Sequence, residues 1–371
     1  MTPPCEQQTP TRWTENRLGL DYRLEAASLG APASPIVDAH THIHGIKAAR
    51  VYKEVRELFG VARTYSMSTL SEVSALRDFF GDSIDFIAVP DFNTDDRKHA
   101  HTAGFLDSIE RFHALGSRVV KFWSAPRARD YGREVGEPDL LALDSHWRLE
   151  AMNLAESLGM MFMTHVADPN TWFEKKYNDA REYGSKLDQY IALERALDRF
   201  TTPWIAAHMG GWPEDLVFLD ALLTRHDNLH LDTSATKWMV RELSKQPRDE
   251  LVAFLIKWKG RILFGSDIVT MDEHLAPAAD PVATRSVQAS SPREAFDLYA
   301  SRYWALRTLF ETEYEGESSI ADPDLAMVDP DQYDEMSAPT LRGKSIPSDL
   351  LQSLYRGAAV NLLDRWRRDH P

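Results

Sequence analysis

The chain has 371 residues, a length that suits one large α/β domain or two ordinary ones. Apolar residues make up 43% of it, enough for a sizeable core, and the net charge of −15 argues against nucleic-acid binding through bulk electrostatics. The single cysteine, Cys5, excludes an internal disulfide and leaves a metal site at most one thiolate ligand. No apolar run approaches the about 20 residues of a membrane helix, and the N-terminus is unlike a secretory signal, so we expect a cytoplasmic protein.

The first 34 residues are polar and contain several prolines, and we interpret residues 1–34 as a lead-in segment to a barrel domain over residues 35–371. From residue 36 onward, short apolar runs alternate with helical patterns. Most of these runs lack polar alternation, which is typical of strands buried on both faces of a parallel sheet. The predicted strands cover residues 36–42, 62–67, 84–90, 119–123, 160–166, 204–208, 229–232 and 262–267.

The helical patterns between the runs have recognisable ends, such as a glycine directly after the last apolar residue. Eight strand–helix units predict a closed (β/α)₈ TIM barrel. An open doubly wound sheet is the alternative, but no glycine-rich phosphate loop supports it. We expect a loop over residues 316–347, and helices over residues 105–115, 145–158, 186–200, 213–225, 249–259, 291–311 and 348–368.

The first predicted strand ends in Asp38-Ala-His40-Thr-His42. Residues two apart on an extended strand point to the same face, so the imidazoles of His40 and His42 converge. Imidazole is a ligand for zinc, iron, copper and nickel. This pair indicates a metal site, and with it a metal-activated water.

Three other predicted strands end in a side chain that can bind a metal, namely His165, His208 and Asp267. A lone histidine or aspartate at a strand end is more often structural than a ligand. In a barrel, however, the C-terminal ends of all strands meet at one mouth, where active sites are built. The joint pattern therefore predicts a catalytic metal site of imidazoles and a carboxylate.

These motifs resemble those of the amidohydrolase superfamily, and most of all its branch of 2-amino-3-carboxymuconate-6-semialdehyde decarboxylase-like proteins. The resemblance rests on Asp38-Ala-His40-Thr-His42, His165, Ala207-His208-Met-Gly-Gly211 and Gly265-Ser-Asp267, and covers about residues 35–270 and the closing helix. It implies that the metal ligands are His40, His42, His165 and Asp267. It also implies that His208 polarises the substrate, moves protons, or serves a second metal.

Lys121 lies near the end of the fourth predicted strand. Binuclear members of the superfamily carry a carboxylated lysine at that place, which bridges two metals. The alternative is a buried lysine paired with an acid, because a buried lysine without a partner is costly. We favour a mononuclear site that holds Zn²⁺, with Mn²⁺ or Fe²⁺ as alternatives and a second metal left open.

Five further side chains are candidates for substrate binding: His44, Trp123, Arg127, Trp172 and Trp212. All follow predicted strands on the catalytic side, and an arginine can hold a carboxylate in a bidentate manner. Ordinary surface packing is at least as good an explanation for each of them.

Our first functional hypothesis is a metal-dependent hydrolase that acts on an amide, ester or lactone-like bond of a small molecule. The alternative is a non-oxidative decarboxylase, a lyase, of a small unsaturated or aromatic carboxylic acid. A metal-binding protein without catalysis is the third, which His208 and Asp267 disfavour, because a structural metal needs no proton shuttle. We expect a small-molecule substrate and no nucleic acid or membrane partner, and a homo-oligomer stays open.

Overall fold

The computed structural model describes residues 13–277 and 288–371. Two parallel sheets hold the central strands, four in the order β3-β2-β1-β9 and five in the order β4-β5-β6-β7-β8. Most of these strands are fully buried, in agreement with their lack of polar alternation. The strands are β1 (Ile36–Ile43), β2 (Val61–Ser66), β3 (Ile84–Phe86), β4 (Val119–Trp123), β5 (Met161–His165), β6 (Trp204–Ala206), β7 (Leu229–Asp232), β8 (Ile262–Leu263) and β9 (Ile268–Thr270).

Backbone hydrogen bonds join the two sheets on both sides. Beyond β3, the amide of Ala88 donates to the carbonyl of Val119 (2.8 Å), and its carbonyl accepts from the amide of Lys121 (2.9 Å). On the other side, Ala39 in β1 donates to the carbonyl of Phe264, just after β8 (2.9 Å). The ring of strands is therefore closed, which confirms the predicted (β/α)₈ barrel.

The eighth strand is interrupted, so the predicted strand over residues 262–267 is wrong in its extent. The chain leaves the ladder after Leu263, and Asp267 adopts a left-handed backbone conformation with φ of 62°. It then resumes as β9, which pairs with the end of β1. The third strand is also shorter than predicted and ends at Phe86.

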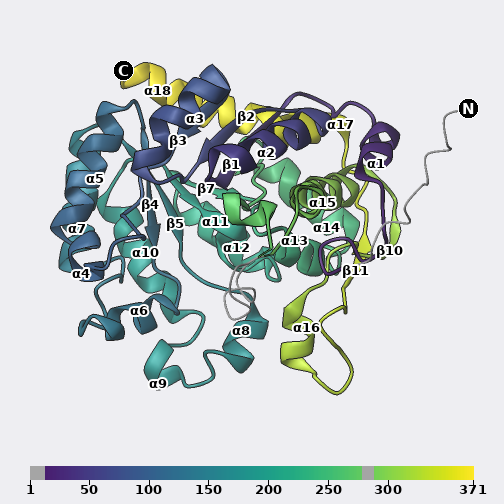
Figure 1. The fold of residues 1–371 in the computed structure, drawn as a ribbon. Helices are drawn as coiled ribbons and strands as arrows, with labels where there is room; N and C mark the ends of the chain where they lie inside the picture. Colours follow the sequence, from purple (N-terminus) through teal and green to yellow (C-terminus); the bar gives the residue numbers. More distant parts are fainter. Residues whose placement is uncertain (1–12, 278–287) are drawn as a thin grey trace, which may run out of the picture.

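Helices surround the strands (Figure 1). Ser145 and Ser291, the first residues of two predicted helices, are the N-caps of α7 and α15. The helix predicted over residues 213–225 starts later, because Asp215 accepts from the amide of Phe218 and caps it there. The helices of this layer are α2 (Ile46–Leu58), α3 (Val73–Phe80), α4 (Arg97–Ala100), α5 (Ala103–Ala114), α6 (Ala128–Glu134), α7 (His146–Ser157), α8 (Asn170–Lys175), α9 (Ala180–Tyr183), α10 (Asp188–Arg199), α12 (Leu216–Arg225), α13 (Thr236–Leu243), α14 (Arg248–Lys257) and α15 (Pro292–Glu311). The short α11 (Ala207–Gly210) is instead a buried turn directly after β6, in which His208 has φ of 59°.

The segment predicted as a loop over residues 316–347 has structure of its own. It contains α16 (Pro323–Val328) between the strands of a hairpin, β10 (Glu315–Glu317) and β11 (Thr340–Arg342). Although far apart in the sequence, α16 and α8 lie side by side at the lower edge of Figure 1. Near the N-terminus, α1 (Tyr22–Leu29) packs on α15.

The closing helix predicted over residues 348–368 is helical but not uniform. It consists of α17 (Ser348–Gln352), two π-helical stretches at Ser353–Gly357 and Val360–Asp364, and α18 (Arg365–Asp369). The carbonyl of Leu354 accepts from the amide of Phe264 (3.1 Å) and so satisfies the backbone at the break in the eighth strand.

Alternation along the strands separates the interior of the barrel from the helix layer. Phe122 in β4 faces the helices, where its ring lies 5.9 Å from Phe105 of α5 and 5.6 Å from Phe162 of β5. Its neighbours Lys121 and Trp123 point to the other side and line a large cavity. The strand pairing thus fixes which side chains reach that cavity.

Candidate metal centre

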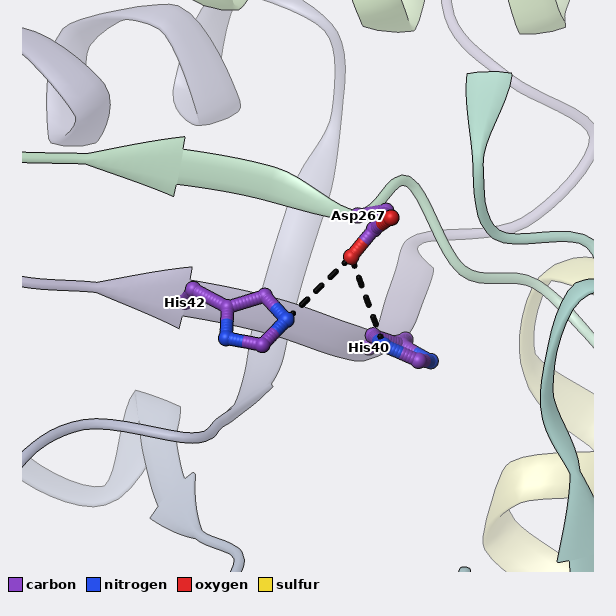
Figure 2. A group of neighbouring side chains, drawn as sticks. All are labelled: His40, His42 and Asp267. Carbon is purple, nitrogen blue, oxygen red and sulfur yellow. Dashed lines mark ion pairs between the residues drawn. The ribbon is translucent and has the colours of Figure 1, made fainter. Parts of the chain in front are cut away.

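The ends of β1 and of the interrupted eighth strand bring His40, His42 and Asp267 together (Figure 2). Asp267 Oδ1 lies 3.2 Å from His42 Nε2 and 3.4 Å from His40 Nε2. His40 is buried, whereas His42 and Asp267 have side chains about one-third exposed, 31% and 28%. The three atoms form one compact group that opens to the cavity.

Backbone strain accompanies this arrangement. Among the described residues, five non-glycine residues have positive φ, and three of them, His208, Ala235 and Asp267, line the cavity. Each such conformation costs about 1–3 kcal/mol and persists only where the surroundings hold it. For Asp267 part of that support is local, because its amide donates to the carbonyl of His40 (2.9 Å).

A second buried group lies beneath the first and was not predicted from the sequence. Asp232, the last residue of β7, accepts from His40 Nδ1 through Oδ2 (2.8 Å). Its Oδ1 accepts from the amides of His208 (2.9 Å) and Ser234 (3.0 Å), and in a short contact from the Ser234 hydroxyl. Ser234 Oγ also lies 2.8 Å from His208 Nδ1. The signal that found the other residues, a metal-capable side chain at a strand end, also marks Asp232.

His165, at the end of β5, is near this group but not part of it. Its ring lies 4.5 Å from the ring of His208, and its Nε2 is 2.9 Å from Oδ1 of the buried Asp168. Tyr177 donates to the other carboxylate oxygen of Asp168 (2.8 Å). With Nε2 held by Asp168, the ring nitrogen of His165 that is available to a ligand is Nδ1.

Lys121 reaches the cavity from β4 with its side chain buried. Among the described residues its ammonium group has no hydrogen-bond partner, so the direct anionic partner expected from the sequence is not found there. Burial lowers the pKa of Lys121 to about 8, although the charges of Asp232 and Asp267 oppose that shift. An uncompensated amine therefore faces the group of acids and imidazoles.

The charges of the site settle the protonation of its acids. Burial alone would raise the pKa of Asp267, but the hydrogen bond from His42 and the attraction of His40 outweigh it and hold that pKa well below its usual range. The same balance, with His40 as the main partner, holds the pKa of Asp232 well below its usual range. Burial lowers the pKa of His208 well below its ordinary value. At neutral pH both acids are ionised and His208 is neutral.

The cavity at this end of the barrel has a volume of about 1240 Å³, larger than most small-molecule sites. Of the five candidates for substrate binding, His44, Trp123 and Trp172 line this cavity, and His44 Nδ1 lies 2.9 Å from Glu72 Oε2. The structure does not bring Arg127 or Trp212 to this cavity.

Both exceptions have simple physical reasons. Arg127 is exposed at the start of α6. The indole of Trp212 instead stacks on Tyr190 (5.8 Å between centroids), contacts Phe218, and carries Lys186 Nζ above its face. A tryptophan that sequence reasoning did not select, Trp238, lines the cavity and contacts the ring of His208 edge-on (5.5 Å).

Comparison with known proteins identifies the family. The sequence profile of the amidohydrolase family matches residues 103–288, half of the chain. The chain therefore belongs to the amidohydrolase family, whose members are metal-dependent enzymes. No curated protein matches the sequence.

Two solved structures resemble the fold. One is described as a probable 2-pyrone-4,6-dicarboxylic acid hydrolase from Acinetobacter baumannii with citric acid bound; it is 10% identical, covers 79% of this chain and 98% of its own, and has a TM-score of 0.41. The other is described as an amidohydrolase from Burkholderia multivorans with bound HEPES; it is 11% identical, covers 89% of this chain and 99% of its own, and has a TM-score of 0.41. None of the helices in the described ranges is long and apolar enough to cross a membrane.

Proposed function

We propose that the chain hydrolyses an amide, ester or lactone-like bond of a small molecule with the help of one divalent metal ion, Zn²⁺ in our assignment. The proposed ligands are His40, His42, His165 and Asp267. The proposed proton-transfer residues are Asp267 and His208. The observation that carries the choice of hydrolysis is the geometry of these last two groups: Asp267 Oδ1 lies beside His40 and His42, and the hydrogen bond between His208 Nδ1 and Ser234 leaves His208 Nε2 as an acceptor.

The donor atoms of His40, His42 and Asp267 are spaced to fit a zinc ion. In a tetrahedral site with bonds of about 2.0–2.1 Å, neighbouring ligand atoms are about 3.3 Å apart. The observed separations of Asp267 Oδ1 from His42 Nε2 and His40 Nε2 are 3.2 and 3.4 Å. The hydrogen bond from His40 Nδ1 to Asp232 leaves the lone pair of Nε2 for the metal, the usual support of a metal-bound imidazole.

A single metal is favoured over two. Over residues 13–277 and 288–371, the other group of candidate ligand atoms comprises His40, His208 and Asp232. The carboxylate of Asp232 already accepts from His40, from two backbone amides and from the hydroxyl of Ser234. Because internal hydrogen bonds saturate this group, it offers no comparable second site. Under this proposal Lys121 is an uncarboxylated amine beside the ligands.

The hydrogen bonds around Ser234 assign a role to His208. The Ser234 hydroxyl donates to Asp232, so its oxygen accepts from His208 Nδ1, 2.8 Å away. In that tautomer His208 Nε2 carries a lone pair, and the residue lines the cavity. His208 is then suited to accept a proton or to orient a water, rather than to donate to a substrate oxygen in the resting enzyme.

Two acceptors favour hydrolysis over decarboxylation. A zinc ion, when bound, lowers the pKa of a coordinated water and polarises a carbonyl oxygen. Hydrolysis then needs a group that takes the proton of the water and later gives it to the leaving group, which the ionised Asp267 and the neutral His208 both suit. Decarboxylation needs a proton at the carbon that loses CO₂, but the ionised Asp267 has none and His208 directs its one N–H at Ser234. Decarboxylation therefore stays the second candidate.

The deciding experiment offers the metal-loaded protein a panel of small amides, esters, lactones and carboxylic acids in ¹⁸O-labelled water. We expect ¹⁸O in the acid product of at least one amide, ester or lactone, and no such product from Asp267→Asn. The control is His99→Gln, an exposed histidine outside the cavity, which should behave as wild type. Release of CO₂ from a carboxylic acid, with no ¹⁸O-labelled product from any amide, ester or lactone, would refute hydrolysis and make decarboxylation the proposed reaction.

A further inference from the structure

Two basic side chains line the same cavity as the candidate metal ligands but have no part in the proposed reaction. Lys237 comes from the start of α13 and Arg302 from α15, two helices that pack against each other. Their side chains are 24% and 10% exposed. Each is mostly withdrawn from solvent and shows a small part of its surface to the cavity.

The two cations share one buried counter-ion, Glu15. Its Oε1 lies 3.1 Å from Lys237 Nζ, and its Oε2 lies 2.5 Å from Arg302 Nη1. Burial alone would raise the pKa of Glu15, but the attraction of Arg302 and Lys237 outweighs it and lowers that pKa. Glu15 is therefore ionised, and the trio carries a net charge of +1.

Most hydrogen-bond donors of the pair are unused. Over residues 13–277 and 288–371, Lys237 Nζ donates only to Glu15, and the guanidinium of Arg302 donates through Nη1 to Ser301 Oγ (3.2 Å) beside its ion pair with Glu15. An ammonium has three donors and a guanidinium five. A partly desolvated positive charge with unused donors is stabilised by an anion that accepts from it.

The acids nearby hydrogen-bond to other groups than Lys237 and Arg302, although Asp322 and Asp324 together carry one charge more than the Arg241 that pairs with both. Asp322 and Asp324 also line the cavity, but both pair with the buried Arg241. Asp272 accepts from the amides of Lys47 and Ala48 at the start of α2. The unused donors of Lys237 and Arg302 therefore remain available to a ligand.

An aromatic surface connects this pair with the histidines. Trp238, next to Lys237 in the chain, contacts the ring of His208 edge-on (5.5 Å) and that of Trp172 (5.6 Å). Both indoles line the cavity. A substrate that spans from the histidines to the basic pair would lay its apolar part against these rings.

We propose that Lys237 and Arg302 form a subsite for a carboxylate of the substrate that is not the reacting group. This inference rests on the proposed function only in taking this cavity as the place where the substrate binds. A carboxylate has two oxygens that can accept from both cations, and as a monoanion it is repelled less by Asp322 and Asp324 than a dianionic phosphate would be. The substrate class is then a small molecule with a hydrolysable bond at one end, a flat apolar middle and a carboxylate at the other end.

The test measures binding rather than turnover, so its outcome is independent of the hydrolysis experiment. Calorimetry on the metal-loaded protein would compare 4-phenylbutyrate with its neutral amide and with phenyl phosphate. We expect the carboxylate to bind best, and Lys237→Met and Arg302→Met each to weaken it about tenfold or more, as for loss of a charged hydrogen bond, while binding of the amide stays unchanged. Lys245→Met is the control, since Lys245 pairs with Glu242 and does not line the cavity.

A further variant gives a change of opposite sign. Glu15→Gln keeps a polar side chain between the cations but removes their internal competitor, so it should tighten binding of 4-phenylbutyrate. Thermal unfolding of each variant checks that it is folded, and Arg302→Lys should retain part of the affinity if Arg302→Met fails that check. Equal carboxylate affinity in wild type and Lys237→Met would overturn the subsite, because the carboxylate would then bind elsewhere, such as at the metal. Tighter binding of phenyl phosphate would overturn the choice of a carboxylate.

Discussion

Replacing Asp232 with asparagine should weaken metal binding at a site that Asp232 does not itself touch. The carboxylate accepts from His40 Nδ1 (2.8 Å), and both side chains are fully buried. An asparagine that keeps its oxygen toward the amides of His208 and Ser234 must turn its NH₂ group toward His40. Two donors would then face each other, unless His40 moves its proton to Nε2, which removes the lone pair that would bind the metal.

The expected magnitude follows from these contacts. A buried hydrogen bond with a charged partner contributes about 1.5–3 kcal/mol, so the metal-free variant should lose stability of that order. Loss of the group that orients a metal-bound histidine typically lowers metal affinity about 10–100-fold. Both effects should appear in one variant, because one carboxylate oxygen serves both purposes.

The assay has two parts. Urea unfolding of the metal-free proteins gives the change in stability, and competition with a chromogenic chelator gives the zinc affinity. Asp220→Asn is the matched control, since Asp220 is a paired carboxylate on the outer helix α12, where it contacts Lys257 and Trp258. The control should change zinc affinity less than twofold.

Unchanged zinc affinity in Asp232→Asn would refute this reasoning. It would mean that His40 is not held by Asp232 in the metal-loaded protein, or that His40 is not a ligand. A loss of stability alone would not rescue the argument, because any buried carboxylate can produce one.

Other perturbations test other parts of the structure. Lys121→Met should stabilise the metal-free protein by about 3 kcal/mol at pH 7, since burial lowers the pKa of Lys121 from 10.5 to about 8 and each unit corresponds to about 1.4 kcal/mol. Between these two pKa values the unfolded chain binds more protons than the folded one, so the stability of the wild type rises with pH and the difference in stability from Lys121→Met should disappear. A difference in the free energy of urea unfolding that does not depend on pH would contradict the lowered pKa of Lys121. Gly211→Ala should cost more than about 2 kcal/mol in thermal unfolding, because Gly211 has φ of 76° and a Cβ there would overlap the carbonyl of Ala167; a melting temperature like that of wild type would disprove this contact. Chelation should lower the melting temperature, and zinc at about 100 times its dissociation constant should restore about 2.7 kcal/mol; no shift on adding zinc would argue against binding to the folded state.

Much of the barrel could be predicted because the signal is local. A strand buried on both faces is a short, continuous apolar run, and β4 and β7 coincide with the predicted ranges. The break in the eighth strand could not be predicted, because a left-handed conformation at Asp267 is imposed by its neighbours and not by residue type.

The candidate site likewise has residues that the sequence could predict and residues that it could not. His40, His42, His208 and Asp267 lie together because strand ends converge in a barrel, a rule that sequence can supply. Glu15 could not be found in this way, since its partner Arg302 lies almost 290 residues away and no local pattern connects them.

The structure of the segment after α15 could not be predicted from the sequence, for a related reason. Its composition of Asp, Pro and Ser favours a loop, yet α16 packs on α8. Trp172 Nε1 donates to Asp324 Oδ2 across that contact (2.8 Å). Such long-range pairing is decided by tertiary packing, which composition does not reveal.

The central claim is that His40 and His42 hold a metal ion at the mouth of the barrel. Elemental analysis of protein purified without chelator tests it most directly, with wild type beside the double variant His40→Ala/His42→Ala. We predict about one equivalent of a divalent metal, chiefly zinc, in wild type and essentially none in the folded variant. A wild-type protein without metal after incubation with zinc, or a variant that retains a full equivalent, would contradict the claim.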